Sequence, residues 1–470
     1  MRIQKSVAHI ARFVLESTTP LSICTGRSNG IFDSLLVRDA NGLPGIPGTS
    51  LAGVLRHLAV RYHTELAALF GSAIKDEESP SNVHVSWGCI HDENDKPVEG
   101  LVLDRDEVNL KSEILAAARD LSPLRRDRVR LDRRGVAQDA GQFDRTALPA
   151  GYRFSAELIY WNETHDNQAW QNLLGLLQNP EMRLGGATRS GYGGLKLVRL
   201  HQRHFKLNDK YDYRDWRELG TNLSDTAGLQ EHTGEEKSCQ PRVVLQLQAE
   251  DGYRFGDGDQ ALEHNEEKDP TIVPVTEKRV IWDGPKARFS QRHLLVPGSG
   301  VKGALRHRFA FHYQRHAKKW AENPDNQHEI EDCEGVRRLF GFAANTKDTN
   351  QQEGHAGHLI FSDVYIKLEE KAYTLPHNGI DRYTGGVRHG VLFAEQVCKA
   401  PIELNVTVCD PGNDRLKDTL LRPALRDTLK DLTEGRLALG AGRGRGWGYF
   451  TGRQNWSDNA AWLHGGHHAE

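Results

Sequence analysis

Two aspartates, Asp33 and Asp283, each stand 14 residues before a Pro-Gly pair, at Pro47-Gly48 and Pro297-Gly298. A carboxylate can hold Mg²⁺ or position a hydroxyl group, and a nearby arginine or lysine can offset the charge of a reacting phosphate. These residue types therefore suit cleavage of a phosphodiester such as RNA, in which the 2′-hydroxyl attacks the adjacent phosphate. The alternative is that each aspartate only closes a loop through an Asx turn.

Each Pro-Gly pair opens a segment in which apolar residues recur at helical spacing. In the first copy Leu51, Leu55 and Leu58 fall on one face, which predicts a helix with one buried side. Thr49 and Ser299 follow the Pro-Gly pairs and are expected to cap the free N–H groups. A helix N-terminus beside an arginine-bearing loop can bind phosphate. A strand–loop–helix packing motif without chemistry is the alternative.

A glycine-rich loop with arginines lies far downstream of each helix, at 184–193 and 439–448. The loops align without a gap, so two unrelated motifs repeat in the same order and indicate an internal duplication. Glycine permits close approach of the main chain, and Arg189 and Arg443 can pair with phosphate bidentately. A loop without function is the competing interpretation. No Gly-Lys-Ser/Thr follows either loop and no strand–turn–helix frames it, so a nucleotide fingerprint is not supported.

Composition limits the class of protein. A chain of 470 residues with 38% hydrophobic content is expected to hold at least two domains. The net charge is −3, so a nucleic-acid site requires local clustering of the 61 lysines and arginines. Six cysteines without a Cys-x-x-Cys pair do not support a zinc ribbon or a thioredoxin site. With no signal peptide and no apolar run of membrane-spanning length, we expect reduced thiols and a cytoplasmic location.

The order of elements predicts an α+β fold with two tandem ferredoxin-like or RRM-like domains. Each half shows strand–helix–strand followed by strand–helix–strand. The predicted ranges are a first domain at 1–200, a polar linker at 201–240, a second domain at 241–455 and a flexible tail at 456–470. Sheets of this type often bind single-stranded RNA, but the fold alone does not define function.

The first half resembles the RAMP proteins, the backbone subunits of type III CRISPR effector complexes. The resemblance is carried by Asp33-Ser34, Arg38-Asp39, the Ile-Pro-Gly-Thr-Ser segment and the glycine-rich loop. Two copies look fused in one chain, as in the type III-D branch. In that family the aspartate at the position of Asp33 carries metal-dependent cleavage of target RNA, so the resemblance implies a catalytic Asp33 with Mg²⁺ as the cofactor.

The second copy departs from the family pattern around Asp283, where Gly284 and Phe289 replace the serine and the second aspartate. Asp283 nevertheless holds the same place in the repeat and is our second catalytic and Mg²⁺-binding candidate. A lysine that the family uses for guide binding is kept as Lys302 in the second copy and is Ala52 in the first.

The resemblance also implies thumb-like insertions near 132–146 and 381–396, which in the family push into the guide–target duplex. The residues predicted to bind RNA are basic side chains of the loops, helices and thumbs: Arg27, Arg38, Arg56, Arg133, Arg134, Arg189, Arg288, Lys302, Arg306, Arg382, Arg388, Arg443 and Arg445.

The function predicted from the sequence is a guide-RNA-binding backbone subunit that cuts complementary target RNA at regular intervals. Its predicted partners are the guide RNA, the target RNA and other effector subunits, without a membrane. One alternative is a subunit that only binds RNA. Another is a metal-independent precursor-processing ribonuclease, which would need a catalytic histidine such as His57 or His307.

Overall fold

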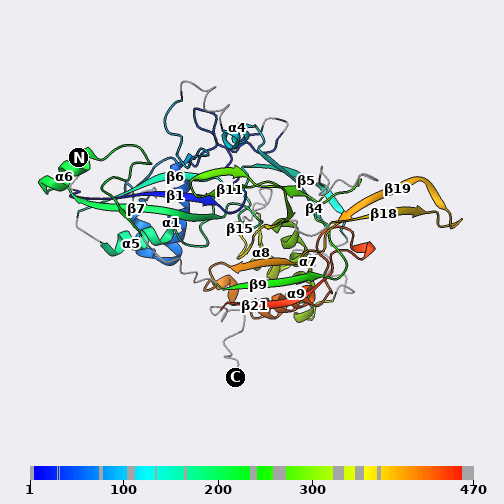
Figure 1. Cartoon of the computed structure of the whole chain (residues 1–470). Helices are drawn as coiled ribbons and strands as arrows, with labels where there is room; N and C mark the ends of the chain where they lie inside the picture. Colours follow the sequence, from blue (N-terminus) through cyan, green and yellow to red (C-terminus); the bar gives the residue numbers. More distant parts are fainter. Residues whose placement is uncertain are drawn as a thin grey trace.

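Two α+β units of the same strand order make up the chain, as its computed structural model shows (Figure 1). The structure describes residues 5–28, 30, 32–72, 78–102, 112–132, 135–163, 167–232, 241–256, 258, 271–320, 333–343, 354–367 and 372–457.

The first repeat is built around an antiparallel sheet. Its elements are β1 (Val7–Ser17), α1 (Gly48–Tyr62), α2 (Thr64–Ala67), β2 (Val83–Val85), β3 (Cys89–Ile90), α4 (Glu113–Arg119), β4 (Leu124–Leu131), β5 (Ala137–Ala147), β6 (Arg153–Asn162), α5 (Asn167–Leu176), β7 (Leu195–Lys206), α6 (Lys210–Glu218) and β8 (Gln230–Glu231). The sheet order is β2-β6-β1-β7-β8, and β3 also pairs with β6.

The second repeat uses the same plan. Its elements are β9 (Arg242–Ala249), β10 (Thr276–Glu277), β11 (Val280–Asp283), β12 (Lys286–Phe289), β13 (His293–Val296), α7 (Gly298–His316), α8 (Glu334–Phe340), β14 (Gly341–Phe342), β15 (His355–Ala356), β16 (Leu359–Phe361), β17 (Val364–Ile366), β18 (Tyr373–Ile380), β19 (Val387–Val397), β20 (Ile402–Val408), α9 (Leu421–Thr433) and β21 (Phe450–Trp456). The sheet order β16-β20-β9-β21 repeats β2-β6-β1-β7, with every pairing antiparallel. The predicted pair of ferredoxin-like domains is confirmed.

The helices that follow the Pro-Gly pairs cover one face of each sheet. Leu51, Leu55 and Leu58 are fully buried in the core of the first repeat, as their spacing predicts. The capping expectation is wrong, because α1 and α7 begin at the glycine and their N-terminal cap residues are prolines without a side-chain cap bond. Thr49 and Ser299 stand one residue inside the first turn, past the cap position.

Two long hairpins project from equivalent places in the two repeats. β4–β5 leaves the first repeat before β6, and β18–β19 leaves the second before β20. They are the thumb-like insertions expected near 132–146 and 381–396, and both begin several residues earlier than expected. In Figure 1 the β18–β19 hairpin extends away from the rest of the molecule, whereas β4–β5 runs toward the second repeat.

The predicted boundary at residue 200 falls inside β7, which continues to Lys206. The segment after β7 packs on the first sheet, because the buried guanidinium of Arg12 donates to the carbonyls of Gly220, Asn222 and Asp225. Much of the expected linker is therefore part of the first unit up to the end of the described range at 232. Residues 233–240 and most of the expected tail, 458–470, lie outside the described residues.

The hairpin β11–β12 of the second repeat lies against the first repeat. Val280 is buried in the core of the first repeat and its N–H donates to the Ala150 carbonyl at 2.9 Å. The Trp282 indole Nε1 donates to the Gly151 carbonyl at 2.7 Å. The two repeats thus share apolar packing, which sets how their sites face one another.

Candidate functional site

Asp33 is held at the base of the first hairpin. Its backbone N–H donates to Asp144 Oδ1 at 3.0 Å, and the Asp144 N–H donates to Asp33 Oδ2 at 3.0 Å. Asp33 is exposed, whereas only 8% of the Asp144 side chain is. Within the described residues, Asp33 Oδ1 accepts no hydrogen bond, so it is available to a ligand.

An arginine accompanies this pair of carboxylates. Arg125 Nη2 lies 3.3 Å from Asp144 Oδ2 and 3.1 Å from Asp127 Oδ1, and its guanidinium lies 5.9 Å from the centre of the Phe32 ring. Its positive charge offsets the repulsion between neighbouring carboxylates and adds a donor close to where a phosphate would sit.

The described residues hold no group of three His, Cys, Asp or Glu side chains that could bind a metal ion by themselves. Mg²⁺ in phosphoryl-transfer sites is often bound by one or two carboxylates together with substrate phosphates and water. The Asp33 carboxylate, whose Oδ1 has no partner among the described residues, fits this mode of binding, in which RNA would complete the ligand set. Both oxygens of Asp144 are already engaged, by the Asp33 N–H and by Arg125.

The two glycine-rich loops have the same geometry. The N–H of Leu184 donates to the Gly193 carbonyl at 2.9 Å, and that of Leu439 to the Gly448 carbonyl at 2.8 Å. Gly191 and Gly446 both have φ of +92°, which confirms that the duplicated sequence keeps its backbone. Tyr192, the aromatic residue of the first loop, is fully buried and so packs rather than presenting a ring to a base.

Cationic side chains from both repeats meet at the joint between the first glycine-rich loop and the start of α7. Lys302 is close enough to Arg306, Arg189 and Arg128 for their charges to act on it. Burial, and then these three charges, lower the pKa of Lys302 to about 8. We call Arg128, Arg189, Lys302 and Arg306 the cationic joint.

Two arginines of the cationic joint are held by uncharged groups. Arg189 donates through Nε to the Gly357 carbonyl at 2.9 Å, and Arg128 through Nη2 to the Ser190 carbonyl at 3.3 Å. The Arg128 guanidinium also stacks 4.5 Å from the centre of the Tyr192 ring. These carbonyls and the ring carry no charge, and the charge of the buried Asp363 also acts on Arg128. The clustering of four cationic side chains suits an anion such as RNA phosphate.

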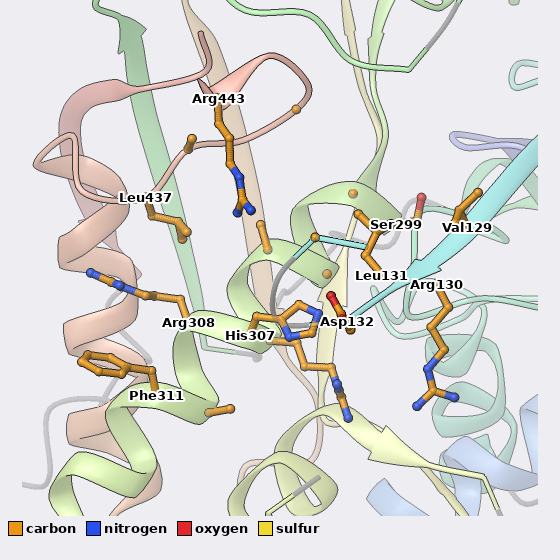
Figure 2. A pocket seen from close by; sticks show the side chains of 18 of the residues that line it. Val129, Arg130, Leu131, Asp132, Ser299, His307, Arg308, Phe311, Leu437 and Arg443 are labelled. Carbon is orange, nitrogen blue, oxygen red and sulfur yellow. The ribbon is translucent and has the colours of Figure 1, made fainter. Parts of the chain in front are cut away.

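A groove of about 1380 Å³ lies between the first hairpin and the second repeat. It is lined by Val129–Asp132 of the hairpin, the exposed face of α7 and the second glycine-rich loop. Figure 2 shows Arg443 extending into it from that loop, with His307, Arg308 and Phe311 along α7. The mixture of arginine, histidine and an aromatic ring suits the backbone and bases of a single strand.

Asp283 does not occupy the counterpart of the Asp33 position. It ends β11 and is exposed at the turn of the β11–β12 hairpin, next to Lys286, whose ammonium donates to Asn94 of the first repeat. The sequence spacing from the Pro-Gly pair is equal, but the chain turns at different points in the two copies. In the second copy the turn comes directly after Asp283, whereas in the first copy it comes later, between Arg38 and Pro44. A catalytic role for Asp283 stays a prediction.

The remaining predicted RNA-binding residues are dispersed. Arg38 donates to the carbonyls of Gly42, Ala118 and Asp120, so it braces its own loop. Arg445 pairs with the fully buried Glu395. The others in this group are exposed on a loop, on α1, on β12 and on the β18–β19 hairpin: Arg27, Arg56, Arg288, Arg382 and Arg388. Arg133 and Arg134 lie outside the described residues.

Sequence reasoning missed Asp144, Arg125 and Arg128. All three belong to arginine- and aspartate-rich strands whose charge pattern is typical of a solvated, internally paired loop. A hairpin prediction for 124–147 with strict alternation would have placed Arg126 and Arg128 on one face. No pattern in the sequence connects Asp144 with Asp33, because 111 residues separate them.

Among the described residues, His57 and His91 each lie beside partner side chains, and a catalytic role for His57 or His307 stays an alternative. His57 Nε2 lies 3.1 Å from the Arg61 guanidinium, and burial followed by the charges of Arg61 and Arg189 lowers its pKa. His91 bridges Asp95 and Ser155 at 2.8 and 2.7 Å, in the order of a hydrolase triad. Because all three side chains are buried in the first sheet, this arrangement stabilises a turn.

A family model described as RAMPs, the RAMP superfamily, matches residues 14–196 and 246–451. These two segments cover most of the chain, so the chain belongs to the RAMP superfamily and carries its domain twice. No curated protein sequence matches the chain. A chain of the solved structure titled "Type III-B Cmr-beta Cryo-EM structure of the Apo state" is similar at 15% identity and a TM-score of 0.29. The match covers 40% of this chain and 96% of that one.

In the described residues, no helix is long and apolar enough to cross a membrane.

Proposed function

We propose that this chain is a backbone subunit of a type III CRISPR effector complex that binds guide RNA along both repeats and cleaves paired target RNA at Asp33. The observation that carries the proposal is the placement of Asp33 at the base of the first hairpin, with Oδ1 directed to no partner among the described residues. Membership of the RAMP superfamily supports it, as does the resemblance of the sequence around Asp33 to the family motif.

The roles of the residues follow from their positions. The cationic joint and the groove would hold the guide backbone, because lysine and arginine side chains clustered there attract phosphate. The hairpins would separate stretches of duplex. Asp33 would orient the 2′-hydroxyl of the target, and Arg125 beside it would offset charge on the phosphate.

Asp33, through its Oδ1, is the residue that would hold Mg²⁺, together with RNA phosphate and water. When bound, the ion would supply a Lewis acid for the phosphate oxygens. Asp283 remains our candidate for a second cut. The regular spacing of the cuts stays a prediction, because Asp283 does not occupy the counterpart of the Asp33 position.

The test uses the complex assembled with guide RNA, a labelled complementary target and Mg²⁺, with products separated on a denaturing gel. Asp33→Ala is expected to remove one cut and leave guide and target bound, since one side chain carries chemistry and little of the affinity. Asp283→Ala removes the other cut, and EDTA removes both. If Asp33→Ala keeps every band, the assignment of cleavage is wrong. Loss of no cut in the double variant would favour a subunit that only binds RNA, and cleavage in EDTA would favour a processing ribonuclease.

A further inference from the structure

The strand β5 and the loop that carries Asp33 are tied by two hydrogen bonds that form a closed ring. Each aspartate accepts the other's backbone N–H, both at 3.0 Å. One bond fixes the backbone of residue 33, and the other fixes the rotamer of its carboxylate. Together they orient Asp33 Oδ1, the oxygen that accepts nothing within the described part of the chain.

The strand is the rigid partner of this ring. Asp144 lies opposite Asp127 in the β4–β5 ladder, its side chain is 8% exposed, and Arg125 holds its Oδ2 at 3.3 Å. The loop that carries Asp33 is loosely packed around Gly26 and Gly30, which have positive φ and open space around them. We infer that the hairpin fixes the position of the loop, rather than the reverse.

The second repeat offers an internal comparison. Leu21 and Leu148 exchange backbone hydrogen bonds in the first repeat, as Tyr253 and Cys398 do in the second. Counting four residues back from Leu148 gives Asp144, and four back from Cys398 gives Ala394.

The residue held against Ala394 is Thr271. The Ala394 N–H donates to Thr271 Oγ1 at 3.5 Å, and the Thr271 N–H donates to the Ala394 carbonyl at 2.9 Å. The second hairpin thus receives a hydroxyl residue at the point where the first receives Asp33, and the carboxylate of Asp144 has no counterpart there.

We propose that Asp144 is the positioning residue of the first repeat, which orients Asp33 for cleavage by accepting its backbone N–H. This inference rests on the proposed cleavage at Asp33. In this proposal the acceptor oxygen of Asp144, and not its charge, orients Asp33. The described residues of the second repeat make no equivalent interaction.

The experiment compares Asp144→Ala with Asp144→Asn in the assembled complex, under single-turnover conditions with Mg²⁺. Asp144→Ala removes the acceptor and is expected to slow the Asp33-dependent cut by about 10- to 100-fold, the effect of a displacement of roughly 1 Å. Asp144→Asn keeps an acceptor oxygen and is expected to restore most of that rate. Target affinity and the melting temperature stay at wild-type values in both variants.

The matched control is Asp127→Ala. Asp127 lies directly opposite Asp144 in the ladder and shares Arg125 with it, but it makes no bond to Asp33. The complex with Asp127→Ala is expected to cut at the wild-type rate. A loss equal to that of Asp144→Ala would show that hairpin stability or the Arg125 pair matters, and would overturn the inference.

Three further results would also overturn it. Equal loss in Asp144→Ala and Asp144→Asn would make Asp144 a direct ligand or charge. If the Asp144 variants also bind target more weakly or melt at a lower temperature, the role of Asp144 is structural. Wild-type cutting by Asp144→Ala, with cutting abolished by Asp33→Ala, would refute the inference and leave the proposed function intact. If Asp33→Ala itself cuts normally, the proposed cleavage at Asp33 is wrong, and the inference that rests on it falls as well.

Discussion

Arg126 on the first hairpin and Asp363 after β16 form a buried ion pair. Arg126 Nη1 lies 2.6 Å from Asp363 Oδ2, and the Asp363 side chain has no exposed area. Asp363 Oδ1 also accepts the N–H of Gly298 at 2.8 Å, and Glu277 takes the other side of the guanidinium at 2.6 Å. Burial raises the pKa of Asp363 although Arg126 acts in the opposite direction. One arginine of the first repeat therefore pairs with two buried carboxylates of the second repeat.

Arg126→Ala leaves Glu277 and Asp363 buried without a counter-charge. We expect it to lower the free energy of unfolding by about 3–5 kcal/mol, measured by urea or thermal denaturation of the purified chain. The control is Arg125→Ala, whose side chain is 48% exposed and pairs at the surface, where such pairs contribute about 0–1 kcal/mol. Similar small effects of the two substitutions would show that the buried pair does not hold the repeats together.

Gly191 and Gly446 provide a matched pair of substitutions. Both have φ of +92°, where an alanine is strained by about 1–2 kcal/mol. A Cβ on Gly191 would lie 2.0 Å from Asp363 Oδ1, whereas a Cβ on Gly446 would meet nothing within 4 Å. Gly191→Ala is therefore expected to cost about 1–3 kcal/mol more than Gly446→Ala in the same denaturation experiment. Equal costs would mean that the structure around Asp363 accommodates the added methyl group without a loss of stability.

Arg189 and Arg443 test the contribution of the glycine-rich loops to RNA binding. If each side chain neutralises one phosphate, its replacement by alanine is expected to reduce the slope of log K against log salt by about 0.7. The measurement is titration of guide RNA at several salt concentrations. Lys196→Ala, which removes an exposed cation paired with Glu16 on the sheet, is the control and should leave the slope unchanged. An unchanged slope in the arginine variants would show that these side chains point elsewhere.

The fold was predictable from the sequence because its signals are local or repeated. The buried face of α1, the two Pro-Gly pairs and the two glycine-rich loops each occupy a short stretch, and their recurrence indicated the duplication. The boundary at 200 was less accurate, because polar residues after β7 pack on the sheet through the carbonyls of residues 220–225. A buried arginine, Arg12, satisfies that backbone, and composition does not show such a contact.

The candidate site was predictable only in part. Sequence motifs pointed to Asp33 and Lys302. Asp144, Arg125 and Arg128 lie on a hairpin whose charge pattern is typical of a solvent-exposed loop, so nothing in the sequence was a reason to select them. Asp283 shows the limit of spacing as evidence. It keeps its distance from the Pro-Gly pair, but the chain between them folds into the β11–β12 hairpin, whose apolar residues pack on the first repeat.

Lys302 gives a prediction for the pH dependence of RNA binding. Its pKa is lowered to about 8 by burial, and then by the charges of Arg306, Arg189 and Arg128. A phosphate beside it would favour the protonated form and raise the pKa in the complex. The free protein must then take up a proton on binding once the pH exceeds about 8, so affinity is full below that pH and declines above it.

We expect the affinity of the wild-type chain for guide RNA to fall by about tenfold between pH 7 and pH 9, as the protonated fraction of a group with a pKa near 8 does. Lys302→Arg keeps its charge throughout and should bind with little pH dependence over the same range. Lys302→Met should bind weakly at both values, because it has no charge to lose. Fluorescence anisotropy at constant ionic strength measures all three. A wild-type affinity that does not change, or an equal fall in Lys302→Arg, would show that Lys302 takes no part in holding the RNA backbone.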